Sequence, residues 1–242
     1  MTILVTRPQP DNERTGASLR ARGFDVLLAP MLRFEPVPLR EDAGADYAAV
    51  IVTSANALRA VETQLTGSGL LNRPVFAVGD RTATAAREAG FRTVVSAGGD
   101  GSGLRDLVAA RAKKFGARPL LYLAGADLSR DLAGELSEDG FNVVTQTTYR
   151  MIASSELPTD VLDAIADNRV EAVLHYSGRS AKAFVEAVRA AGVEISALAL
   201  PQCCISATVA AILRDAGATR VTVASAPDES SLFQAVDRAL AG

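Results

Sequence analysis

Short runs of apolar and β-branched residues alternate along this chain with stretches of about 10–15 residues in which apolar positions recur at helical spacing. Strands are expected at residues 3–6 and 48–53. A helix is expected at residues 11–22, and Gly23 would end it. Strands that alternate with helices in this way are typical of parallel βα units, so the pattern predicts an α/β fold built on parallel sheets.

The second half of the chain repeats the order of the first. Two repeats of about 120 residues are too few for a solenoid and indicate two similar α/β domains. Three pairs of similar segments show the repeat: residues 23–26 and 140–143, 49–54 and 172–177, and 87–90 and 214–217.

The repeat leaves two divisions of the chain open. A sequential cut would fall near Gly116. Residues 30–38 and 147–152, however, both look extended and occupy the same place in each repeat. If these two segments are paired crossovers, one domain contains both ends of the chain.

Composition and charge exclude several classes of partner. The chain is 48% hydrophobic and 22% charged, as is ordinary for a globular protein, and its net charge of −3 provides no basic field for nucleic acid or anionic lipid. It has no apolar run long enough to span a membrane and no signal-peptide pattern at its start. Neither nucleic acid nor membrane is therefore an expected partner.

Cysteine and histidine are scarce. Cys203 and Cys204 are neighbours in an apolar run, where strand geometry would point them to opposite faces, so we expect two reduced core thiols, which fit the cytoplasm. The single His175 lies in an apolar strand and is expected to be a core histidine. With one histidine and no HExxH, CxxC or GxSxG motif, neither a metal site nor a hydrolytic triad is expected.

A glycine-rich segment, Gly98–Gly103, lies between an expected strand and an expected helix. Its spacing matches neither the phosphate-binding loop nor the dinucleotide-binding fingerprint. We therefore expect a flexible loop in which Ser102 caps the following helix, and no nicotinamide cofactor.

Small hydroxyl or amide residues stand at four expected helix starts, at residues 53–56, 79–82, 176–180 and 206–208. Each is typical of an N-cap. Together they place helix N-termini at the carboxyl ends of two parallel sheets, where backbone N–H groups and the helix dipole favour carboxylates. Four arginines in or near these turns could add charged donors: Arg7, Arg81, Arg130 and Arg179.

Six short motifs follow one another in a fixed order along the chain. They are Val5-Thr6-Arg7-Pro8, residues 52–57 (VTSANA), residues 78–83 (VGDRTA), Leu123-Ala124-Gly125 followed by Arg130, Tyr149 in the sequence TTY, and Ser177-Gly178-Arg179-Ser180. In their order and spacing they resemble the uroporphyrinogen III synthase family. The chain departs from that family at residues 206–210 (SATVA), where the family often has Gly-Pro-x-Thr-Ala, and Thr208 is the substitute for the family's hydroxyl there.

The resemblance implies two parallel-sheet α/β domains joined by a two-stranded linker. The first domain, discontinuous, would comprise residues 1–30 and 155–242, the second residues 39–145, and the linker strands residues 31–38 and 146–154. The resemblance also implies a cytoplasmic, monomeric enzyme without metal or cofactor. Its small-molecule substrate would be hydroxymethylbilane, a linear tetrapyrrole, cyclised to uroporphyrinogen III with inversion of ring D and loss of water.

The resemblance further implies a set of site residues. Tyr149 is the expected proton donor to the departing hydroxyl, because a phenol is protonated at neutral pH, although it could instead pack the hinge. Two other functions stay open: a non-catalytic module that binds a tetrapyrrole or another polyanion, and a nucleotide-dependent α/β enzyme. The expected substrate-binding residues are Arg7, Thr53, Ser54, Asn56, Gly79, Thr82, Gly125, Arg130, Ser177, Gly178, Ser180 and Thr208.

Overall fold

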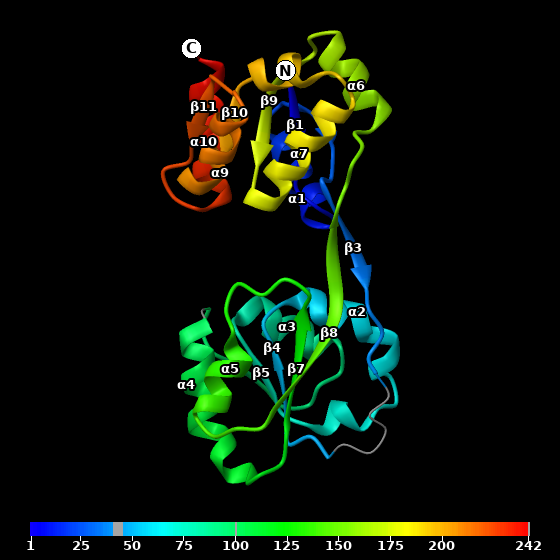
Figure 1. Ribbon diagram of the computed structural model, residues 1–242, viewed down its shortest axis with the longest axis vertical. Coiled ribbons are helices and arrows are strands. Elements are labelled where there is room, and N and C mark those ends of the chain that lie inside the picture. The colour runs from blue at the N-terminus through cyan, green and yellow to red at the C-terminus, as the bar shows by residue number, and fades with distance from the viewer. Residues whose placement is uncertain (41–45, 100, 242) are drawn as a thin grey trace. The chain divides into compact units, whose positions relative to one another are not determined.

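The computed structural model describes residues 1–40, 46–99 and 101–241, and it divides the chain into two compact units (Figure 1). Unit 1 comprises Met1–Phe34 and Ile152–Gly242, and unit 2 comprises Glu35–Met151. Each unit is an α/β domain with its own sheet, and the first is discontinuous in sequence. The predicted fold class is confirmed.

Unit 1 is built on a five-stranded parallel sheet with the order β11-β10-β9-β1-β2. The N-terminal strand β1 thus pairs with β9, from the far half of the chain. The strands are β1 (Thr2–Val5), β2 (Asp25–Leu28), β9 (Val170–His175), β10 (Gln202–Cys204) and β11 (Val221–Val223). The helices are α1 (Asp11–Ala21), α6 (Thr159–Ala166), α7 (Gly178–Ala190), α8 (Glu194–Ala199), α9 (Ala207–Asp215) and α10 (Glu229–Leu240).

Helices cover both faces of this sheet. Leu4 and Val173 belong to a core with residues of α6, α7 and α8, whereas Ile3 and Leu174 belong to a core with residues of α1 and α10. Successive residues of a strand point to opposite faces, so β1 and β9 supply apolar side chains to two cores at once. This is why Ile3–Val5 and Ala172–Leu174 are continuous hydrophobic runs in the sequence.

The second sheet has six strands in the order β3-β8-β7-β4-β5-β6. Its strands are β3 (Leu32–Pro36), β4 (Ala49–Val52), β5 (Val75–Ala77), β6 (Val94–Ser96), β7 (Leu120–Gly125) and β8 (Val143–Ala153). The helices of unit 2 are α2 (Ala55–Leu65), α3 (Asp80–Glu88), α4 (Gly101–Ala112) and α5 (Leu132–Glu138), with the short 3₁₀ helices η1 (Gly69–Asn72) and η2 (Lys113–Phe115).

Unit 2 also has a core on each face of its sheet. Val50 and Leu123 pack with residues of α2 and α3, and Ile51 and Tyr122 pack with residues of α4 and α5. The strands β4, β5, β6, β7 and β8 are parallel to one another, so their carboxyl ends meet at one edge. That edge places the residues that follow β4 and β7 close together.

The chain passes between the units twice, within β3 and within β8. The N–H of Val37 donates to the carbonyl of Thr148 (2.6 Å), and the N–H of Ser154 donates to the carbonyl of Met31 (3.0 Å). The earlier residue of one segment thus pairs with the later residue of the other, so the two segments run antiparallel.

The helix after the glycine-rich segment begins earlier than predicted. Gly98 (φ 87°) and Gly99 (φ 135°) adopt backbone conformations that favour glycine, and they turn the chain so that α4 starts at Gly101. Ser102 therefore lies inside the helix, and its prediction as the cap was wrong. Asp100, the preceding residue, lies outside the described residues.

Candidate functional site

Serines that follow strands cap three of the described helices, as the sequence predicted. Ser54, Ser177 and Ser206 each accept a hydrogen bond from a backbone N–H two or three residues later, at 3.2, 3.1 and 3.4 Å. Each serine satisfies one of the N–H groups that have no acceptor within the helix. The N-termini of α2, α7 and α9 thus lie at the carboxyl ends of β4, β9 and β10, where their dipoles favour an anion.

The start of α3 is shaped by a glycine. Gly79 is its N-cap, and a Cβ at this position would lie only 3.1 Å from the Cα of Gly99, whose N–H donates to the carbonyl of Val78 (2.8 Å). The absence of a side chain at Gly79 lets this loop approach the helix start. Thr82 lies within the first turn and is buried, so it does not cap α3.

Tyr149 follows an irregularity between β7 and β8. Ala124 pairs with Thr147, but Gly125 pairs with Tyr149, so β8 carries one extra residue, Thr148. The buried Thr148 hydroxyl donates to the carbonyl of Ala124 (3.1 Å). A bulge of this kind redirects the next side chain. The Tyr149 ring lies against Gly125, where a Cβ would be 2.7 Å from the ring carbon Cζ and 2.8 Å from the hydroxyl oxygen.

A second tyrosine, Tyr122 in β7, was not predicted from the sequence as a site residue. Tyr122 is only 2% exposed, and its hydroxyl lies 3.0 Å from Oγ1 of Thr53. Burial raises the pKa of Tyr122 more than the hydrogen bond with Thr53 lowers it, so the phenol is neutral at pH 7. Thr53 is half-buried between β4 and the cap Ser54, and Asn56 is half-buried in the first turn of α2. A tyrosine inside an apolar strand has no signal in a single sequence.

Arg130, shortly before α5, is held in place by neighbours in unit 2. Its Nε and Nη2 donate to the two carboxylate oxygens of Glu135, each at 2.6 Å, and its Nη1 donates to Oγ of Ser102 (3.0 Å). The stem packs against Gly101, where a Cβ would lie 3.2 Å from Cδ of Arg130. The hydrogen bond from Arg130 lowers the pKa of Glu135. The guanidinium is therefore oriented in the absence of any ligand.

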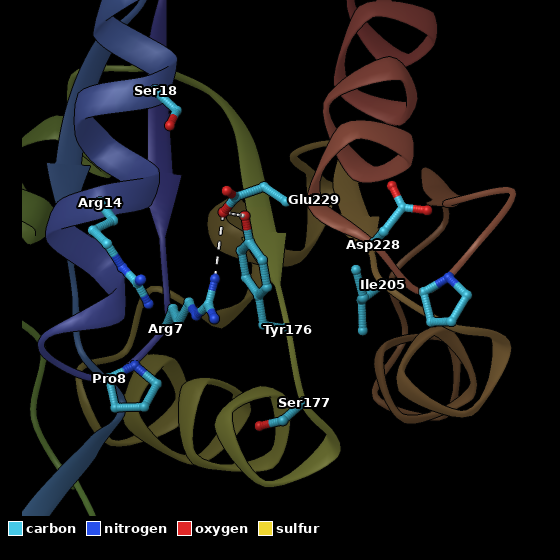
Figure 2. A pocket seen from close by; sticks show the side chains of 10 residues that line it. Arg7, Pro8, Arg14, Ser18, Tyr176, Ser177, Ile205, Asp228 and Glu229 are labelled. Carbon is cyan, nitrogen blue, oxygen red and sulfur yellow. Dashed lines mark hydrogen bonds and ion pairs between the residues drawn. The ribbon is translucent and has the colours of Figure 1, made fainter. Parts of the chain in front are cut away.

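Unit 1 contains a cavity of about 640 Å³ at the carboxyl ends of β1 and β9, beside the starts of α1 and α10 (Figure 2). Arg7 and Arg14 line one side, Tyr176 and Ser177 another, and Glu229 a third. Parallel α/β sheets commonly bind ligands at this edge. The sequence predicted Arg7 and Ser177 here, but not the other three residues.

Arg7 is held between two carboxylates. Its Nη1 donates to Oε1 of Glu229 (3.3 Å), its Nη2 donates to Asp11 (3.1 Å), and its guanidinium stacks over the ring of Tyr176 at 4.5 Å from the ring centre. The same Glu229 oxygen accepts hydrogen bonds from the hydroxyls of Thr15 (2.6 Å) and Tyr176 (2.8 Å). A ligand carboxylate at Arg7 would have to share this guanidinium with Glu229. Tyr176 and Glu229 come from segments far from Arg7 in the chain, so spacing could not reveal them.

The remaining predicted residues of unit 1 lie at the starts of α7 and α9. Gly178 is the first residue of α7, and a Cβ there would lie 3.0 Å from Cδ1 of Ile212. Ser180 is fully buried and accepts a hydrogen bond from the Ser177 hydroxyl (3.0 Å). Thr208 is exposed in the first turn of α9, whose cap is Ser206.

His175 is a buried core residue, as predicted. Its Nε2 lies 2.9 Å from Oε1 of Gln202, and its Nδ1 lies 3.3 Å from Oγ1 of Thr6. Burial lowers the pKa of His175 to about 4, so the imidazole is neutral at pH 7. Cys203 and Cys204 are buried free thiols in different cores, and burial raises the pKa of each to about 12.

The described part of the chain has neither a metal-binding cluster nor a membrane-spanning helix. Residues 1–40, 46–99 and 101–241 contain no group of three or more His, Cys, Asp or Glu side chains that could hold a metal ion. Within the same residues, no helix combines the length and apolar character that crossing a membrane requires.

Comparisons with known proteins agree with these motifs. The model of the uroporphyrinogen-III synthase HemD family matches residues 13–234. No curated protein is similar enough in sequence to be matched.

Two solved structures show the same fold. The uroporphyrinogen-III synthetase of Helicobacter pylori is 18% identical, with a TM-score of 0.64 and 98% of each chain covered. A mutant uroporphyrinogen III synthase of the extremely thermophilic bacterium Thermus thermophilus is 19% identical, with a TM-score of 0.56, and the match covers 100% of this chain and 99% of that one.

Proposed function

Because this chain belongs to the uroporphyrinogen-III synthase family, we propose that the residues at its strand ends hold hydroxymethylbilane while ring D is inverted and the macrocycle is closed. The cyclisation of hydroxymethylbilane to uroporphyrinogen III is the reaction of tetrapyrrole biosynthesis that this family performs.

The chemistry sets two requirements. The terminal hydroxymethyl group leaves as water and gives an azafulvenium cation. Attack on this cation by the substituted carbon of ring D forms a spiro intermediate, which fragments and closes again with the ring inverted. Closure without inversion occurs spontaneously, so the protein must control the conformation of the substrate as well as lower a barrier, and this is a task of proximity and orientation.

The carboxylates of the substrate provide the handles for this control. Helix N-termini at the strand ends of each unit offer backbone N–H groups, and Ser54, Gly79 and Ser177 mark three of these starts. Arg130 adds a guanidinium whose direction is fixed by Glu135. Such donors are ordered before the substrate arrives, so binding costs little further ordering.

Tyr149 is the proposed general acid. Its phenol protonates the departing hydroxyl, and the proton released from the pyrrole on closure restores the phenol. The observation that supports this assignment is the packing of the Tyr149 ring against Gly125, which follows from the bulge at Thr148. A bulge and a glycine together fix the direction of one side chain at the carboxyl end of β7.

The test is to incubate the protein with enzymatically prepared hydroxymethylbilane and to separate the oxidised porphyrin isomers by chromatography. We expect the inverted isomer. Binding of the substrate without formation of this isomer would instead identify a non-catalytic tetrapyrrole-binding module.

We also propose that the enzyme acts as a monomer in the cytoplasm, without a nucleic-acid partner. The buried thiols Cys203 and Cys204 and the net charge of −3 support this proposal. Sedimentation at micromolar concentration should give the mass of one chain, 25.2 kDa. A dimer mass would contradict it.

A further inference from the structure

The hydroxyls of Tyr122 and Thr53 form a pair at the carboxyl end of β4 in unit 2. The two oxygens are 3.0 Å apart, and either could donate. Within the described residues, each hydroxyl has only the other as a side-chain partner. Which of the two donates decides what Thr53 can offer to a ligand.

Burial settles the direction of this hydrogen bond. Tyr122 is 2% exposed and packs in the core between the sheet and the helices α4 and α5. If Thr53 were the donor, the phenol proton would be buried without an acceptor, and an unmade buried hydrogen bond is costly. The phenol therefore donates to Oγ1 of Thr53.

Thr53 is consequently left with its own proton to donate. Thr53 is half-buried, whereas Tyr122 is buried, so the Thr53 hydroxyl is the one of the two that a ligand at the strand end can reach. A hydroxyl that accepts one hydrogen bond becomes a stronger donor in the next, because hydrogen bonds in a chain polarise one another.

We infer that Tyr122 is a positioning residue, which turns the Thr53 hydroxyl into a fixed donor for a carboxylate of the tetrapyrrole substrate. This inference rests on the proposed function, since it names how one residue of that site is oriented. Tyr122 does not touch the substrate and acts only through Thr53.

The test is a double-mutant cycle on the steady-state kinetics of isomer formation. Loss of a hydrogen bond to a charged acceptor corresponds to about ten-fold or more in affinity, so Thr53→Val should raise KM about ten-fold. Tyr122→Phe leaves the Thr53 hydroxyl in place but removes the hydrogen bond that orients it, and should raise KM about three- to ten-fold. In both variants kcat should change less than about two-fold, because the lost contact serves binding.

The double variant distinguishes positioning from a structural role. If Tyr122 acts through Thr53, then Tyr122→Phe has no further effect on KM once Thr53 is valine. Equal effects of Tyr122→Phe in both backgrounds would overturn the inference, as would an unchanged KM in either single variant. Tyr47→Phe, which removes another buried phenol hydroxyl of unit 2 at the opposite end of β4, is the matched control and should leave KM unchanged.

Two further measurements keep the inference testable. If Tyr122→Phe fails to fold, Thr53→Ser must have the KM of the wild type and Thr53→Val must have a higher one. Equal KM values in Thr53→Ser and Thr53→Val would overturn the inference. Fluorescence titration with uroporphyrin III, the oxidised product, measures the same carboxylate contact without turnover. An inactive wild type that binds uroporphyrin III, and loses affinity on Tyr122→Phe, would refute the proposed reaction and leave this inference standing.

Discussion

Gly125→Ala adds a single methyl group at the place where the Tyr149 ring packs, and so tests whether this contact positions the phenol. The added methyl group would lie 2.7 Å from Cζ of Tyr149 and 2.8 Å from its hydroxyl oxygen. Carbon atoms at optimal contact are about 3.5–4.0 Å apart, so the ring has to move by about 0.8 Å or more. The backbone of Gly125 needs no positive φ, so alanine fits the main chain, and the three atoms nearest its methyl group all belong to Tyr149.

The expected cost follows from this displacement. A shift of about 1 Å in a reacting group can lower turnover about 10²-fold, and overpacking at one methyl group costs about 1–3 kcal/mol of stability. We therefore expect Gly125→Ala to lower kcat about ten- to one-hundred-fold and to reduce the free energy of unfolding only modestly. Steady-state formation of the inverted isomer and urea denaturation measure the two quantities.

Two comparisons show whether Tyr149 mediates the effect. In a Tyr149→Phe background, Gly125→Ala should cost little further activity, because the hydroxyl that it displaces is already absent. Gly69→Ala is the control, since a Cβ at Gly69 in the same unit meets no atom within 4 Å. Full activity in Gly125→Ala would refute the idea that the contact with Gly125 positions Tyr149 as the general acid.

The remaining predictions concern the acid, the caps, pH and metals. Tyr149→Phe should lower turnover by about ten- to one-thousand-fold with little change in thermal midpoint, since general acids contribute about 10²–10⁴ at most; a large drop in the midpoint would make Tyr149 a packing residue. Ser177→Ala should lower the free energy of unfolding by about 0.5–2 kcal/mol. It should cost less activity than Tyr149→Phe, because the backbone N–H donors remain. Denaturation and turnover measure the two effects, and a larger loss of turnover in Ser177→Ala than in Tyr149→Phe would contradict this reasoning. His175 has its pKa lowered from 6.5 to about 4 in the folded state, so it favours folding fully above pH 6.5 and this contribution, about 3 kcal/mol, is lost as the pH falls toward 4. Urea denaturation at pH 7 and pH 4.5 should show a smaller loss in His175→Asn than in the wild type, and equal losses would contradict the assignment. Activity should survive treatment with EDTA. A loss of activity that is reversed by adding a divalent ion would contradict a metal-free reaction.

The fold class could be predicted from the sequence because its sheets are parallel apart from β3, which runs antiparallel to β8. The central strands of such sheets are buried on both faces, so β4 is an uninterrupted apolar run and β9 contains only two polar residues, Glu171 and His175. The caps Ser54, Ser177 and Ser206 were predictable for a similar reason, because an N-cap is a local interaction between residues two or three positions apart.

Long-range neighbours were not predictable in this way. The contact of Glu229 with Arg7 joins the two ends of the chain, and the pairing of Tyr122 with Thr53 joins two strands. Neither is recorded in local spacing. The helix start at Gly101 was missed because a serine in a glycine-rich segment has the same local pattern whether it caps the helix or lies within it.

The central claim is that the chain closes hydroxymethylbilane with inversion of ring D. The most direct test mixes the purified protein with freshly prepared hydroxymethylbilane, oxidises the products and resolves the porphyrin isomers by chromatography, beside a sample without protein. The account predicts that the inverted isomer predominates with the protein and that the non-inverted isomer predominates without it. The same isomer ratio in both samples would contradict the account.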